Sequence, residues 1–139
     1  AAGHRGAEAA AFERKVPVPA TLAITVLTSM DAESLAATGV SRALPEQVSS
    51  LAVQARKAGL SGIVCSPQEA SSMRELLGPD AFIVTPGVRP AGSAKGDQSR
   101  VATPAQAFEN GASHIVVGRP ITQAEDPVAA FEAIAAELA

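Results

Sequence analysis

Two arginine-containing segments have the residue types of an anion-binding site. Residues 85–90 read TPGVRP, so Arg89 follows a Pro-Gly turn at the end of an apolar run. Gly118 and Arg119 directly follow another apolar run. A guanidinium can bind two phosphate oxygens at once, and glycine lets the backbone approach a ligand closely. If both runs end on the same side of a sheet, the two segments converge on one anion, and phosphate is favoured.

The segment between these arginines, residues 91–100, is rich in Gly, Ser and Ala and contains Gln98. It has too few apolar residues to pack firmly, which favours a mobile loop over an anionic substrate, with Gln98 as a polar contact. An ordinary surface loop with solvated charges explains the segment equally well when it is taken alone.

Two hydroxyl groups follow a further apolar run. Thr28 and Ser29 are suited to hydrogen bonds with a base or a sugar. Asp31, or even Ser29, could also cap a short helix that ends at Ala37. Both uses are compatible with each other.

The histidines and the single cysteine favour structural roles. His4 lies near the N-terminus and His114 opens an apolar run. Cys65 lies within such a run, which predicts a buried strand residue rather than a reactive thiol. With no second Cys or paired His, neither an internal disulfide nor a zinc site is expected.

Four short apolar runs alternate with helical segments. The β-branched, nearly continuous apolar pattern predicts strands buried on both faces at residues 22–27, 62–65, 81–85 and 114–117. Helices are predicted at about residues 3–14, 45–58 and 66–77, and from residues 103 and 126 onward. The last three begin with an N-cap followed by proline: Ser66-Pro67, Thr103-Pro104 and Asp126-Pro127. Left-handed residues are predicted where helices end, at Gly59, Gly78 and Gly111.

Alternating strands and helices predict an α/β fold with parallel strands and right-handed crossovers. This order fits an open doubly wound sheet or part of a (β/α)8 barrel. The barrel is favoured because the unusual loops follow the strands and no G-x-G-x-x-G motif is present. The 139 residues are about half of the ~250 typical of a whole barrel. We therefore expect an incomplete barrel, beginning within a helix and leaving two unpaired strand edges.

The composition argues against two classes of partner. The formal net charge is −3 and no basic stripe is present, which argues against nucleic-acid binding. No apolar stretch approaches the ~20 residues of a membrane span, and no signal peptide is evident, so no membrane association is expected. A cytoplasmic protein is predicted.

Four segments together resemble bacterial orotidine 5'-phosphate decarboxylase in their order and spacing: residues 25–30, 85–90, 97–104 and 114–122. The resemblance extends from about Leu22 to the C-terminus. It implies that the runs are strands five to eight, the C-terminal half, of a TIM (β/α)8 barrel. It also implies a substrate-binding set consisting of Thr28 and Ser29 at the pyrimidine and ribose, Pro86 at the base, Gln98 between phosphate and base, and Arg89, Gly118 and Arg119 at the phosphate.

One departure from the family pattern concerns the chemistry. The family uses an Asp-x-Lys-x-x-Asp motif and a further Lys, whereas the three lysines here, Lys15, Lys57 and Lys95, are not in that arrangement. The strand Asp that helps hold the nucleotide in the family is also missing. Without the proton donor and the carboxylates, most of the rate enhancement is lost. We expect no catalytic residue in these 139 residues and no turnover by the chain alone.

The resemblance implies conversion of orotidine 5'-phosphate to UMP and CO2 in pyrimidine biosynthesis, by a homodimer that needs no metal or cofactor. Two alternatives remain. The first is a sugar-phosphate decarboxylase or aldolase of the same superfamily. The second is a non-catalytic, phosphate-binding half-barrel that self-associates through its strand edges.

Overall fold

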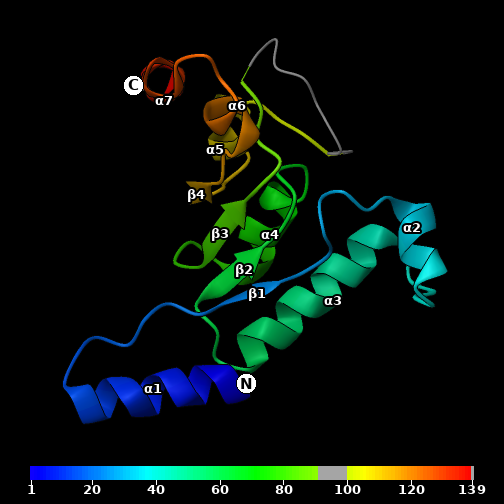
Figure 1. The fold of residues 1–139 in the computed structure, drawn as a ribbon. Helices are drawn as coiled ribbons and strands as arrows, with labels where there is room; N and C mark the ends of the chain where they lie inside the picture. The colour runs from blue at the N-terminus through cyan, green and yellow to red at the C-terminus, as the bar shows by residue number, and fades with distance from the viewer. Residues whose placement is uncertain (91–99, 139) are drawn as a thin grey trace.

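The computed structural model describes residues 1–90 and 100–138, in which strands and helices alternate along the chain (Figure 1). The strands are β1 (Leu22–Ile24), β2 (Gly62–Val64), β3 (Phe82–Thr85) and β4 (His114–Ile115). The helices are α1 (Ala2–Arg14), α2 (Ala32–Ala37), α3 (Leu44–Lys57), α4 (Ala70–Leu77), α5 (Pro104–Glu109), α6 (Arg119–Thr122) and α7 (Pro127–Glu137). None of the described helices is long and apolar enough to cross a membrane.

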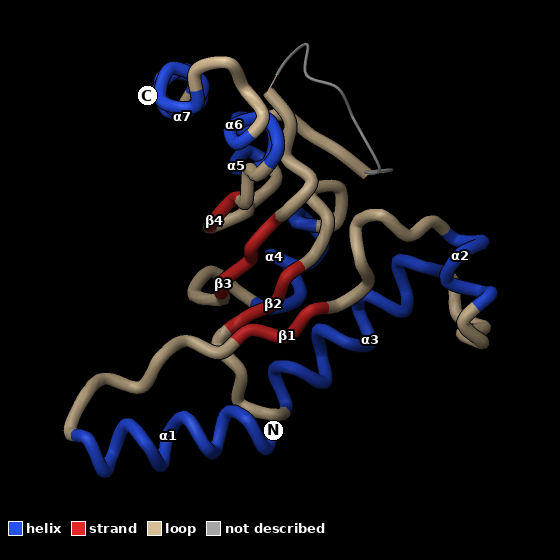
Figure 2. Tube along the Cα trace, in the orientation of Figure 1, coloured by secondary structure: helices blue, strands red, loops and turns tan. Residues whose placement is uncertain are grey.

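The four strands form one parallel sheet in the order β1-β2-β3-β4. Each strand therefore pairs with the next one along the chain, and helices α3 and α4 cover the same face of the sheet (Figure 2). A doubly wound sheet would reverse its strand order and carry helices on both faces. The sequential order and single helical layer confirm the predicted barrel-type arrangement of strands and helices.

The strands are shorter than predicted and end at Ile24, Val64, Thr85 and Ile115. The ladder nevertheless continues for one more hydrogen bond at each side of the sheet. Thr25 N donates to Val64 O at 3.1 Å, and Val116 N donates to Thr85 O at 2.9 Å.

The face of the sheet toward α3 and α4 holds the core. Ile63 and Ile83, which are register partners, are completely buried, as are Val48 and Ala52 of α3. The alternating side chains of a strand point to opposite faces, and packing here covers only one of them. Burial of apolar area on this face supplies the main favourable term for folding.

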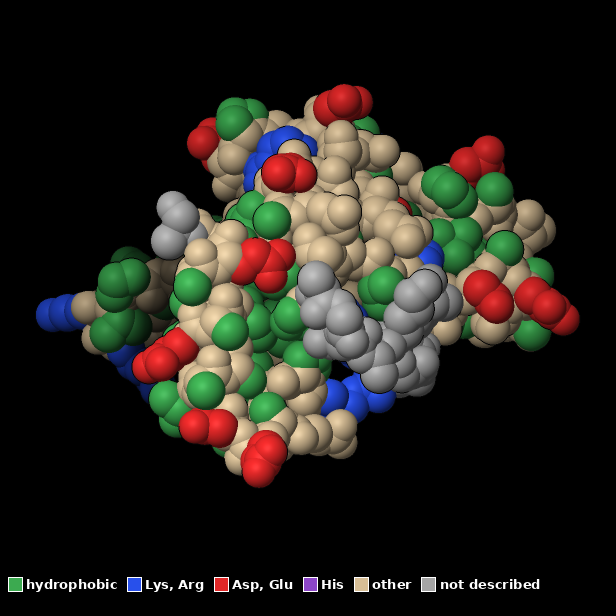
Figure 3. All heavy atoms as spheres, turned by 90° about the horizontal axis from the view of Figure 1, so that it is seen from above, with side chains coloured by type: hydrophobic (Ala, Val, Ile, Leu, Met, Phe, Trp, Pro, Cys, Tyr) green, Lys and Arg blue, Asp and Glu red, His purple; other side chains and the backbone are tan. Residues whose placement is uncertain are grey.

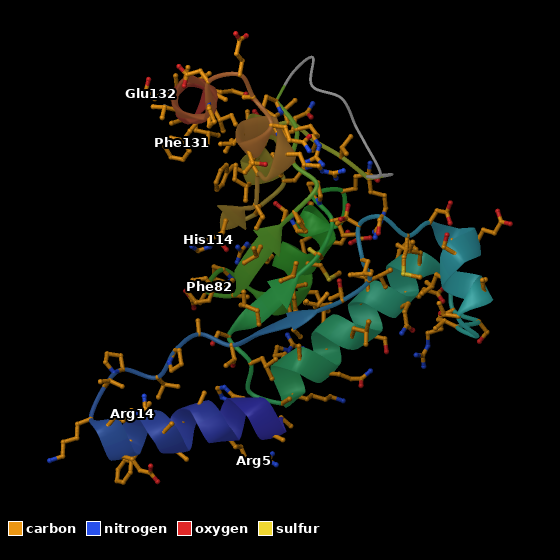
Figure 4. The ribbon with its side chains drawn as sticks, in the orientation of Figure 1. Arg5, Arg14, Phe82, His114, Phe131 and Glu132 are labelled. Atoms are coloured by element: carbon orange, nitrogen blue, oxygen red, sulfur yellow. The ribbon has the colours of Figure 1, made fainter. Side chains whose placement is uncertain are left out.

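The opposite face of the sheet is open at β1, β3 and β4, so the prediction of strands buried on both faces is wrong for these strands, whereas β2 is buried or half-buried at every residue. Ile24 is 65% exposed, and Leu22 and Phe82 are also exposed. Phe82 and His114 lie side by side on neighbouring strands and point away from α3 and α4 (Figure 4), with ring centroids 5.5 Å apart. We call these four residues the open face.

Helix termini follow the predicted capping pattern in two of three cases. Thr103 forms a capping box with Gln106 at α5, and Asp126 accepts from two backbone N–H groups at the start of α7. The prediction for Ser66 is wrong, because α4 begins only at Ala70. Ser66 instead begins a tight turn, in which its hydroxyl oxygen accepts from Gln68 N at 3.1 Å.

The three glycines expected at helix ends all have positive φ: 79° at Gly59, 91° at Gly78 and 92° at Gly111. His4 has a structural role, as predicted. Its Nδ1 forms a 2.7 Å hydrogen bond with Thr21 Oγ1, which attaches α1 to the start of β1.

Candidate functional site

The carboxyl ends of the strands bring the described members of the predicted binding set to one end of the sheet. They follow β1, β3 and β4, and they are Thr28, Ser29, Pro86, Arg89, Gly118 and Arg119. Figure 3 looks down toward this end, where some basic side chains are visible and acidic side chains are scattered around the outside. Parallel strands gather the loops that follow them, which is why residues far apart in the sequence meet here.

Thr28 and Ser29 are the central residues of a tight turn after β1. The turn is closed by a 3.0 Å hydrogen bond from Met30 N to Leu27 O. Thr28 is buried and Ser29 is exposed. The helix cap predicted here is Asp31, whose carboxylate accepts from Ser34 N at 2.8 Å. This hydrogen bond lowers the pKa of Asp31.

Arg89 is more enclosed than the sequence suggests. Arginine side chains are mostly exposed in proteins, but Arg89 is only 8% exposed, and its Nη1 donates to Val88 O at 2.8 Å. Arg89 is enclosed because the backbone after β3 stays hydrogen-bonded to the segment that contains Ala102. Arg89 N donates to Ala102 O at 2.9 Å, and Val88 forms a parallel bridge with Ala102.

Gly118 and Arg119 form the turn into α6. Gly118 is the N-cap, and its carbonyl accepts from Ile121 N and Thr122 N at 2.9 and 3.0 Å. Arg119 is exposed. A Cβ added at Gly118 would meet nothing within 4 Å, so the space beside this backbone is open.

Of the remaining predicted residues, Pro86 is half-buried directly after β3. Gln98 lies outside the described residues. No group of three or more His, Cys, Asp or Glu side chains that could hold a metal ion occurs in the part of the chain that the structure describes.

Comparison with known proteins identifies the family. Residues 1–134 match the model of the orotidine 5'-phosphate decarboxylase / HUMPS family. The chain belongs to this family. The sequence is 58% identical over 132 residues to an orotidine 5'-phosphate decarboxylase of Moorella thermoacetica, covering 94% of this chain and 52% of that protein. A decarboxylase of the same name from Halorhodospira halophila is 53% identical, covering 99% and 59% respectively.

A solved structure agrees with this family assignment. The crystal structure of orotidine 5'-phosphate decarboxylase from Lactobacillus acidophilus superposes with a TM-score of 0.73 at 45% identity, covering 88% of this chain and 50% of that one. The fold is thus about half of a TIM barrel. The chain spans about half the length of the curated relatives it matches.

The chain also contains a buried ion pair between residues that no sequence motif connects. Arg100 Nη1 donates to Glu69 Oε1, and both residues are 9% exposed. Burial lowers the pKa of Arg100. The sequence does contain a signal for the other contact of Glu69, because Ser66 and Glu69 have the S-x-x-E spacing in which the carboxylate reaches back to the first backbone N–H. That bond forms, from Ser66 N to Glu69 Oε2 at 2.9 Å.

Cys65 precedes this turn and is buried, as predicted. Burial raises the pKa of its thiol to about 12, although the nearby charge of Arg100 acts in the opposite direction. A thiol with so high a pKa is protonated at neutral pH and is a weak nucleophile.

Proposed function

We propose that this chain provides the phosphate- and base-binding part of an orotidine 5'-phosphate decarboxylase, which forms UMP and CO2 in pyrimidine biosynthesis. The observation that carries the proposal is the placement of Arg89 and Arg119 after the adjacent parallel strands β3 and β4. Family membership supports it, because the matched relatives carry this name.

The phosphate end of the proposed site uses three residues. Arg89 and Arg119 supply charge-assisted hydrogen bonds to phosphate oxygens. Gly118 lets the ligand approach the backbone, a role supported by the open space beside its Cα. Arg89 is buried, so its interaction with a phosphate is weakened less by solvent than that of an exposed side chain.

The nucleoside end uses Thr28, Ser29 and Pro86. The two hydroxyl groups can donate to and accept from the pyrimidine and ribose, and the half-buried proline provides an apolar surface for the base. A ligand that carries both a phosphate and a pyrimidine would engage both ends of this arrangement.

The proposal assigns no catalytic residue to these 139 residues. The sequence has no Asp-x-Lys-x-x-Asp motif to supply the proton donor and the neighbouring carboxylates. We propose that those groups come from outside this sequence, and that the complete enzyme is a cytoplasmic homodimer. Sedimentation of the active enzyme tests the oligomeric state.

Ligand titration tests the binding proposal directly. Calorimetry of the chain with UMP should show binding, and Arg89→Ala or Arg119→Ala should each weaken it by about 10–100-fold, as expected for a lost hydrogen bond to a charged group. Arg56→Ala is a matched control, because Arg56 donates to Leu76 O away from the strand carboxyl ends. Tighter binding of ribulose 5-phosphate than of UMP would instead favour a sugar-phosphate enzyme.

A second experiment tests the activity. The chain is co-expressed with the part of the Moorella thermoacetica relative that lies outside its match to this chain. The purified pair should convert orotidine 5'-phosphate to UMP, whereas either piece alone should not. Turnover by this chain alone would contradict the assignment of the chemistry to other residues.

A further inference from the structure

A buried carboxylate is anchored at the carboxyl end of β2. Glu69 accepts from Ser66 N through Oε2 at 2.9 Å, and its Oε1 accepts from Arg100 Nη1. Glu69 and Arg100 are both about nine-tenths buried. The carboxylate therefore joins the backbone after β2 to a guanidinium that comes from after β3.

The same guanidinium also reaches the turn after β1. Arg100 Nη2 donates to Leu27 O at 2.9 Å, and this carbonyl is the one that accepts from Met30 N to close the turn. The central residues of that turn are Thr28 and Ser29. Arg100 thus holds the backbone that carries the proposed nucleoside contacts.

Two residues further along, the chain is tied to the proposed phosphate contact. Ala102 O accepts from Arg89 N at 2.9 Å, and Ala102 bridges Val88. The short stretch from Arg100 to Ala102 is therefore hydrogen-bonded to the turn at Thr28 on one side and to Arg89 on the other.

Stability alone does not account for this arrangement. Well-packed apolar residues in place of a buried ion pair are often neutral or stabilising. In addition, Arg100 Nε is buried without a hydrogen-bond partner in the described part of the chain. A planar guanidinium does, however, fix the relative direction of two acceptors, here a carboxylate and a carbonyl, in a way that a point charge does not.

We propose that Glu69 and Arg100 are a positioning pair, which sets the distance between the Thr28–Ser29 turn and Arg89 so that one nucleotide can contact both. The inference rests on the proposed function, because it assigns these residues to the two ends of one ligand. The pair itself touches no reacting atom.

The test compares a two-ended ligand with a one-ended ligand. UMP reaches both the turn and the arginines, whereas inorganic phosphate needs only the arginines. Arg100→Lys keeps the charge next to Glu69 but cannot span both acceptors. We expect this variant to bind UMP about tenfold more weakly, the net contribution of one hydrogen bond, with phosphate affinity unchanged within about twofold. Glu69→Gln keeps the shape of the side chain. It should also lower the ratio of UMP affinity to phosphate affinity.

Arg74→Lys is the matched control, because Arg74 also joins loops through its guanidinium, but at the amino ends of β3 and β4. It should lower stability without changing the ratio of UMP to phosphate affinity. Equal weakening of both ligands in Arg100→Lys, no weakening of either, or an equal change of ratio in Arg74→Lys would overturn the proposal.

Hydrogen exchange of the free chain separates this inference from the proposed function. Arg100→Lys should accelerate exchange at the amides of Met30 and Arg89 severalfold, with the amides within α3 unchanged. If the unsubstituted chain binds no UMP, the proposed function fails, and the exchange data still decide whether the pair positions these segments. Unchanged exchange at the amides of Met30 and Arg89 would refute the positioning role of Glu69 and Arg100.

Discussion

An arginine connects loops at each end of the sheet, and the two arginines differ in the acceptors of their hydrogen bonds. At the amino ends, Arg74 donates only to backbone carbonyls in its described hydrogen bonds: those of Gly78, Pro79, Ala81 and Gly111, at 2.8 to 3.1 Å. At the carboxyl ends, Arg100 divides its guanidinium between the carboxylate of Glu69 and the carbonyl of Leu27.

This difference separates the stabilising end of the sheet from the end that carries the candidate site. Arg74 is half-buried and donates to backbone carbonyls of the loops that precede β3 and β4. Arg100 is buried with Glu69, and burying these two charges costs desolvation free energy. Arg100 also lies beside the turn that contains Thr28. In barrels, the amino end serves stability and the carboxyl end carries the chemistry. The hydrogen bonds fit this rule: Arg74 joins loops at the amino ends, and Arg100 joins segments beside the candidate site at the carboxyl ends.

Removal of the Arg100 guanidinium should have the largest effect. Arg100→Met leaves the Glu69 carboxylate buried and unpaired, so the free energy of unfolding should fall by about 3–5 kcal/mol. Urea denaturation followed by circular dichroism measures this change. The double variant Arg100→Met/Glu69→Leu should recover most of the loss. A double variant as unstable as Arg100→Met would show that the unpaired charge is not the cause.

The corresponding change at the amino end should be smaller. Arg74→Met removes four hydrogen bonds of a partly solvated guanidinium, and we expect a loss of about 2 kcal/mol in the same denaturation experiment. Because Arg74 has no carboxylate partner among its described hydrogen bonds, the loss is not caused by an unpaired buried charge. A loss as large as that of Arg100→Met would remove the distinction between the two ends.

A helix cap near the candidate site provides a change that leaves both arginines intact. Thr103→Ala removes the side-chain oxygen that accepts from Gln106 N at the start of α5. The free energy of unfolding should fall by about 1 kcal/mol. UMP affinity, measured by calorimetry well below the melting temperature, should not change. A loss of affinity would mean that general stability, rather than positioning, controls binding at this end.

The pH dependence from Cys65 should be the smallest effect under ordinary conditions. The folded thiol has its pKa raised to about 12, whereas the unfolded thiol ionises near the ordinary value of 9.0. Its contribution to stability is therefore complete below pH 9 and is lost as the pH rises from 9 toward 12. Denaturation midpoints measured across this range should fall more steeply for the unsubstituted chain than for Cys65→Ala. Parallel curves would show that the folded thiol ionises normally.

The sequence predicted the order and type of the main elements because their patterns are local. The apolar runs, the caps at Thr103 and Asp126 and the glycines at helix ends each depend on a few neighbouring residues. The same local reasoning failed at Ser66, where a tight turn with Glu69 delays the start of α4. It also failed for the burial of β1, because burial depends on what lies against a strand and not on the strand itself.

The candidate site was predicted in part. The loops that follow the strands identified the segments around Thr28, Arg89 and Arg119 correctly as neighbours at one end of the sheet. The contact between Glu69 and Arg100 joins residues 31 positions apart. No periodicity or motif reveals a pairing at that separation, because it depends on how far the chain after β3 folds back over β2.

The open face has a calorimetric consequence. Unfolding normally raises the heat capacity by about 12–15 cal/mol/K per residue, because apolar groups become hydrated. Ile24 and Phe82 are already in contact with water in the folded chain. Part of their contribution to that increase is already present in the folded chain, so the heat capacity change per residue should be smaller than usual. The stability curve of this chain would then be flatter with temperature than that of a domain whose sheet is covered on both sides.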